Sequence, residues 1–144
     1  MRAVLVALAI WVFGAGATVA QGASFNTVIE VADPRSDRMS AALNLALNLA
    51  RDNALYAPGS EVRVIAMGEG LRLLRADTSP MASRVTFTQR SLKGVSFWVG
   101  QDELDAIAAR EGQPPPLIDI VRIAPNAASA IALWKAEGFS IIRP

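Results

Sequence analysis

Apolar and polar positions follow two rhythms along this chain, and the rhythms predict strands alternating with helices. Residues 27–31 (TVIEV) are mostly β-branched and end at Asp33-Pro34, which predicts a strand followed by a turn. From Ser36, a candidate helix cap, to about Asn53, apolar residues recur on one face and predict an amphipathic helix. Four further strands are expected at residues 61–67, 95–99, 117–123 and 139–142. Further helical segments are expected at 71–74, at 80–90 with Pro80 first and Asp77 or Ser79 as cap, at 102–110 and at 126–136.

This order of elements predicts an α/β fold with a largely parallel sheet covered on both faces. The stretch Gly112-Gln113-Pro114-Pro115-Pro116 is linker-like but too short to divide domains, so residues 21–144 are expected to form a single domain. In such sheets ligands bind beyond the carboxyl ends of the strands. The candidate ligand-binding residues at those positions are Asp33, Gly68, Gly70, Gly100, Gln101 and Asn126.

Residues 1–20 have the pattern of a secretory signal peptide. Arg2 supplies a positive start, residues 3–13 form an apolar run, and small residues follow up to Ala20. Cleavage is expected before Gln21, which places the mature protein in the periplasm. The alternative is an uncleaved anchor, because residues 3–20 approach the length that crosses a bilayer.

The charge balance argues against nucleic-acid and membrane partners. Without Arg2, 13 of the 14 basic side chains remain against 13 acidic ones, so the mature chain is nearly neutral. A neutral surface has no strong field to attract nucleic acid or anionic lipid.

The absence of two residue types removes several kinds of chemistry. The chain has no cysteine, so it has no disulfide, thiol nucleophile or thiolate metal ligand. It also has no histidine, the commonest general base and transition-metal ligand. No cofactor and no metal are expected.

Three local groupings have both a chemical and a structural interpretation. Gly68-Glu69-Gly70 offers backbone N–H groups to an anion, although two glycines in a sharp turn are the better account. Asp102, Glu103 and Asp105 suggest a hard cation, but acids at a helix start already suit the helix dipole. Asp33 is the best carboxylate for acid–base work, and it is also an ordinary turn residue before proline.

Several stretches, in order and at the right spacing, resemble the DsrE/DsrF-like family from about Thr27 to Pro144. They are residues 43–48 (LNLALN), 64–71 (VIAMGEGL), 94–97 (GVSF) and 137–144 (EGFSIIRP). The resemblance implies a three-layer α/β/α sandwich with a mostly parallel five-stranded sheet, assembled as a homo-oligomer, often a trimer or hexamer. Sulfur-relay members of the family carry a cysteine just after the third strand, and Gly100 occupies that position here. Because only a thiolate can carry persulfide, this chain cannot transfer persulfide by itself.

The sequence therefore favours an exported, non-catalytic binding or accessory protein, with a possible protein partner in sulfur metabolism. Two alternatives stay open. One is an enzyme that uses Asp33, Gln101 or Asn126 around a small ligand at the strand ends. The other is a structural partner for a cysteine-bearing paralogue.

Overall fold

The computed structural model describes residues 24–144, so the signal-peptide prediction for residues 1–20 lies outside the described part. Five strands form one sheet in the order β4-β3-β2-β1-β5, and every neighbouring pair is parallel. The strands are β1 (Thr27–Val31), β2 (Val62–Ala66), β3 (Val95–Gly100), β4 (Arg122–Ala124) and β5 (Ser140–Ile142). The helices are α1 (Ser36–Tyr56), a 3-10 helix η1 (Gly68–Leu74), α2 (Ala82–Ser91), α3 (Gln101–Glu111) and α4 (Ala127–Ala136). The α/β fold with a parallel five-stranded sheet is thereby confirmed.

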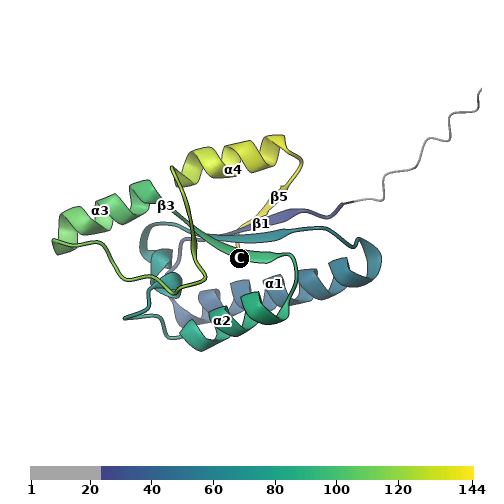
Figure 1. Cartoon of the computed structure of the whole chain (residues 1–144), viewed down its shortest axis with the longest axis horizontal. Helices are drawn as coiled ribbons and strands as arrows, with labels where there is room; N and C mark the ends of the chain where they lie inside the picture. Colours follow the sequence, from purple (N-terminus) through teal and green to yellow (C-terminus); the bar gives the residue numbers. More distant parts are fainter. Residues whose placement is uncertain (1–23) are drawn as a thin grey trace, which may run out of the picture.

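The helices cover the sheet in two layers. Helices α1 and α2 lie on one side, and α3 and α4 lie on the other (Figure 1). The larger core joins α1 and α2 to alternate residues of the three central strands, such as Ile29, Val64 and Phe97. The smaller core on the opposite side joins α4 to Val28 and Ile65. Strands with both faces buried explain the nearly continuous apolar runs in the sequence.

Two expected helix starts are wrong in detail. Ser36 is the first residue of α1 rather than its cap, and the capping position belongs to Arg35, which makes no side-chain capping bond. Pro80 lies in a turn before α2, which begins at Ala82. The Ser79 hydroxyl donates to the Leu73 carbonyl at 2.6 Å and accepts the Met81 N–H at 3.2 Å. Ser79 therefore tightens the turn, and the helix starts after it.

The expected strand at residues 117–123 is the largest local error. Only residues 122–124 pair with β3, while Leu117 makes an isolated antiparallel bridge with Arg75 and a turn joins Ile118 to Val121. The apolar side chains of this segment pack into the core, with Ile118 in the larger cluster and Leu117 beside residues of α3 and β3. The apolar run in the sequence thus reflects a partly buried loop and not a strand.

None of the helices formed by residues 24–144 is long and apolar enough to cross a bilayer.

Candidate functional site

The carboxyl ends of the strands meet at the first turn of α3. Gly100 ends β3 and caps α3, which begins at Gln101 and carries Asp102 and Glu103 in its first turn. The Glu103 Oε2 atom accepts a hydrogen bond from the Gly68 N–H at 2.9 Å. Gly68 opens η1 with a φ of +52°, a conformation that favours glycine. The Gly68 N–H, which the sequence analysis considered as a donor to an anionic ligand, is therefore already bound to the Glu103 carboxylate.

Asp102 does the same at the start of α4. Its Oδ1 accepts the Ala127 N–H at 3.0 Å, and its Oδ2 accepts the Asn126 side-chain amide at 3.2 Å. Asn126 in turn caps α4, because its Oδ1 accepts the Ser129 N–H at 2.9 Å. A negative side chain and a cap at a helix N-terminus satisfy free donors and the helix dipole together. An external anion would have to displace both side chains.

Gly100 has no room for a side chain. A Cβ built on it would lie 2.1 Å from the Asp102 Oδ1 atom, 2.5 Å from the Ala127 nitrogen and 2.9 Å from the Ala127 Cβ. Asp102 can rotate away, but the Ala127 nitrogen belongs to the backbone of α4. The position at which the resemblance expects a cysteine is thus closed by the start of α4.

The other candidate residues are apart from this network. Asp33 is partly buried and accepts hydrogen bonds from Arg35, whose guanidinium Nη2 lies 2.9 Å from Oδ2. These hydrogen bonds lower the pKa of Asp33 below its ordinary value, which makes the carboxylate a weaker base. Gln101 donates to Asp105 at 2.9 Å on the exposed side of α3. Gly70 is buried against the Val31 carbonyl and serves packing.

Sequence reasoning missed Glu30, a buried carboxylate in β1. Glu30 is 8% exposed and forms a salt bridge with Arg143 of the C-terminal tail. This salt bridge raises the pKa of Arg143, chiefly through its hydrogen bond to the carboxylate. An acid within the apolar run TVIEV was the available signal, since a buried charge normally has a partner.

Glu30 lines a cleft of about 400 Å³ between α4 and the strands. The other lining residues are Met67, Ala128, Ile131, Ala132, Lys135, Ile141 and Arg143. The cleft is mostly apolar, and its buried carboxylate is already paired with Arg143. The salt bridge fastens the C-terminal tail to the sheet, and this is the role that the contacts support.

Within residues 24–144, no cluster of three or more acidic side chains is placed to hold a metal ion. Asp102 and Glu103 bind backbone N–H groups, and Asp105 accepts the Gln101 amide. The electrostatic account of these acids at the start of α3 is sufficient, because each of the three has a hydrogen-bond donor.

Replacing Asp102 by alanine should lower the free energy of unfolding by about 1 kcal/mol, because the start of α4 loses its carboxylate partner. Urea unfolding measures the loss, and amide hydrogen exchange at Ala127 should become faster. Asp105→Ala is the matched control, since Asp105 accepts only the Gln101 side chain. Equal losses in the two variants would contradict a special role for Asp102.

This architecture is that of a small parallel α/β/α sandwich. The solved structures that share it include the following two. A protein of unknown function, MTH1491, from Methanobacterium thermoautotrophicum superposes with a TM-score of 0.71 at 22% identity, over 84% of this chain and all of that one. The ychN protein from E. coli superposes with a TM-score of 0.58 at 18% identity, over 83% of this chain and 99% of that one. No family model and no curated protein sequence matches the chain. The two structures establish the fold, which agrees with the sandwich expected from the DsrE/DsrF-like resemblance.

Proposed function

We propose that this protein is an exported DsrE-like binding or accessory protein that is not itself a catalyst. The observation that carries the proposal is the occupied carboxyl end of the sheet. The Gly68 and Ala127 N–H groups already bind Glu103 and Asp102, so the usual ligand position of such folds is filled by the chain. The reactive residue types are also missing, because the sequence contains neither cysteine nor histidine.

Persulfide transfer is outside the abilities of this chain alone. Sulfur relay needs a thiolate, and the sequence has none. The closed space at Gly100 supports the same conclusion, since even a methyl group would contact α4 there. A link to sulfur-compound metabolism would therefore run through a protein partner, and it rests on the family resemblance.

The enzyme alternative loses support from the contacts of its proposed residues. Asp33 is bound to Arg35, Gln101 to Asp105 and Asn126 to Asp102 and Ser129. None of these hydrogen bonds brings two of the three side chains together. Each therefore has a structural partner within the chain.

An anion titration tests the occupied strand ends. We expect backbone amide NMR signals of Gly68 and Ala127 in the wild type to stay unchanged when sulfate is added at constant ionic strength. In the double variant Asp102→Ala/Glu103→Ala the same N–H groups are free, and sulfate should shift them saturably. Asp105→Ala is the control and should behave like the wild type. Saturable shifts in the wild type at low millimolar sulfate would overturn the proposal.

Export and assembly are part of the proposal and need a separate measurement. The full chain, expressed with its leader, should appear in the periplasm with a denatured mass that starts at Gln21. Its native mass should equal three or six subunits, an assembly that half-exposed Ile123 on edge strand β4 and exposed Leu133 on α4 would help to form. An unprocessed chain would contradict export, and a monomer would contradict assembly.

A further inference from the structure

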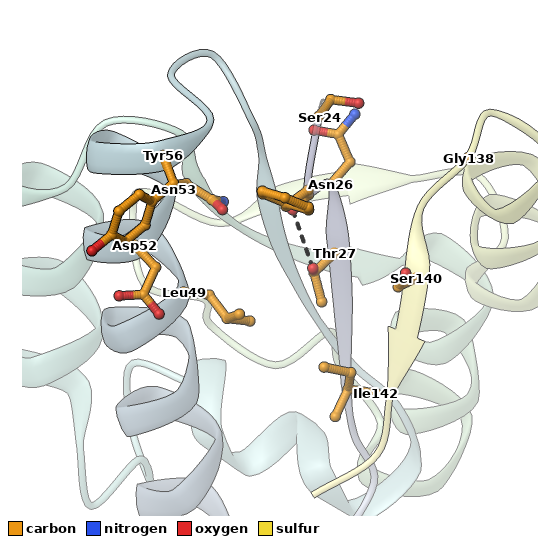
Figure 2. Close-up of a pocket in the computed structure, with 11 residues that line it drawn as sticks. Ser24, Asn26, Thr27, Leu49, Asp52, Asn53, Tyr56, Gly138, Ser140 and Ile142 are labelled. Atoms are coloured by element: carbon orange, nitrogen blue, oxygen red, sulfur yellow. Dashed lines mark hydrogen bonds between the residues drawn. The ribbon is translucent and has the colours of Figure 1, made fainter. Parts of the chain in front are cut away.

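A groove lies at the opposite end of the sheet, where the parallel strands begin. It lies between the last turns of α1 and the starts of β1 and β5, and it has a volume of about 440 Å³ (Figure 2). Phe25, Leu49, Tyr56 and Ile142 give it apolar walls. The volume falls within the range of small-molecule sites, which are mostly apolar with a few placed polar groups.

Among the polar residues that line this groove, Asn53 has a buried and unpaired side-chain atom. The residue is 5% exposed, and its Nδ2 atom has no hydrogen-bond partner among residues 24–144. Figure 2 shows Asn53 extending from α1 toward β1, across the groove. Buried polar atoms are nearly always paired, so an unpaired amide donor indicates a missing acceptor. A carbonyl oxygen is the acceptor that suits an amide N–H.

The opposite wall of the groove is held in place by hydrogen bonds. The Phe25 N–H donates to the Ser60 hydroxyl at 2.9 Å, and the Asn26 side-chain oxygen accepts the Glu61 N–H at 2.8 Å. Phe25 nevertheless stays 53% exposed, and Tyr56 on the facing helix is 75% exposed. Two aromatic rings are thus presented to solvent beside the unpaired amide, and a fixed wall lowers the entropic cost of binding.

Charge narrows the class of ligand. Among residues 24–144, Asp52 is the charged side chain that lines the groove, and no basic residue of this part of the chain lines it. A carboxylate at the rim disfavours anions and attracts a cation. The chemistry that fits is an apolar group joined to a carbonyl and an ammonium.

We propose that this groove binds small apolar amines that carry a neutral carbonyl, as amino-acid amides do. The carbonyl oxygen of the ligand accepts a hydrogen bond from Asn53 Nδ2, and the ammonium group of the ligand lies toward Asp52. The apolar part of the ligand packs against Phe25, Leu49 and Tyr56. The site is distinct from the carboxyl end of the sheet. Its success or failure is therefore independent of the function proposed above.

Titration with L-leucinamide, followed by two-dimensional NMR on the mature chain, tests the site. We expect saturable shifts of the Asn53 side-chain NH₂ and of residues around Phe25. Asn53→Leu keeps the volume and removes the donor, so it should weaken binding about 10-fold while leaving stability equal or higher. Asn48→Leu is the matched control, because Asn48 is an exposed asparagine of the same helix, and it should bind like the wild type.

A second set of titrations tests whether the Asp52 carboxylate contributes to binding of the ligand's ammonium group. Asp52→Asn should weaken leucinamide binding roughly 2- to 5-fold and leave the neutral 4-methylpentanamide unaffected, because an exposed ion pair contributes little. N-acetyl-leucine, an anion, should not bind to the wild type. Unchanged leucinamide binding in Asn53→Leu, or no saturable shift in the wild type, would overturn the proposal. So would a native mass that falls in Asn53→Leu, since it would identify a second copy of the chain as the occupant.

Discussion

Replacing Gly70 by alanine is expected to lower the free energy of unfolding by about 3 kcal/mol. A Cβ on Gly70 would lie 2.1 Å from the Val31 carbonyl oxygen, 2.6 Å from its carbon and 2.8 Å from the Ala32 Cα. All three atoms belong to the backbone at the end of central strand β1, so no side-chain rotation relieves the clash. Either η1 or the end of β1 must move, and both pack against buried residues. Urea denaturation followed by circular dichroism measures the loss.

Gly59→Ala separates this clash from the general cost of replacing a glycine. Gly59 has a φ of +91° and nothing within 4 Å of a built Cβ, so only backbone strain opposes the alanine. That strain is worth about 1 kcal/mol. If the two variants lost the same stability, the close approach of Gly70 to β1 would not be the cause.

Gly100→Cys is expected to lose about 2 kcal/mol of stability, because the position has no room for a side chain. The new Cβ would meet the Ala127 nitrogen at 2.5 Å, and it would push Asp102 from the start of α4. The variant should unfold at lower urea, and hydrogen exchange at Ala127 should become faster than in the wild type.

Two further variants identify the cause of that loss. Gly100→Ala should be destabilised as much as Gly100→Cys, since the Cβ and not the thiol makes the contact. Gly112→Ala replaces a glycine at the other end of α3, with a φ of +83° and open space, and should lose only about 1 kcal/mol. A fully stable Gly100→Cys would show that α4 can move outward and that the position remains able to hold a cysteine.

The two expected losses share a physical origin. At both positions the backbone of one element approaches another so closely that only hydrogen fits between them. Gly70 brings η1 against β1, and Gly100 brings the end of β3 against α4. The carboxyl end of the sheet is therefore packed tightly where related architectures leave space for a ligand.

Patterning along the chain was sufficient for the main elements. The β-branched run at 27–31 became β1 with its expected bounds, and the amphipathic segment from Ser36 became α1. Alternating strands and helices correctly predicted a parallel sheet covered on both faces, because only that arrangement buries runs that are apolar on both sides. Composition decided the chemistry that is missing, since a chain without cysteine has no thiolate in any fold.

The hydrophobic pattern gave a wrong prediction where apolar residues are buried without forming a strand. Residues 117–121 have an apolar run like a strand, yet residues 118–121 form a turn, and the apolar side chains of the run pack into the core clusters. Hydrophobicity reports that a side chain is buried but not which backbone pairs with it. Pro80 likewise fits a helix start by propensity, whereas the Ser79 hydrogen bonds place it in a turn.

The sequence by itself determined the fold class, the near neutrality of the chain and the absence of thiol chemistry, because these follow from residue type and local period. Only the tertiary structure decided what the polar residues do. Asp102 and Asn126 are 24 positions apart, and Glu30 and Arg143 are 113 positions apart, so their pairing appears only after folding. The same is true of Asn53, whose buried Nδ2 atom has no hydrogen-bond partner within the described residues 24–144. Contacts between residues far apart in the sequence decide whether a polar atom has a hydrogen-bond partner, and a local sequence pattern does not contain that information.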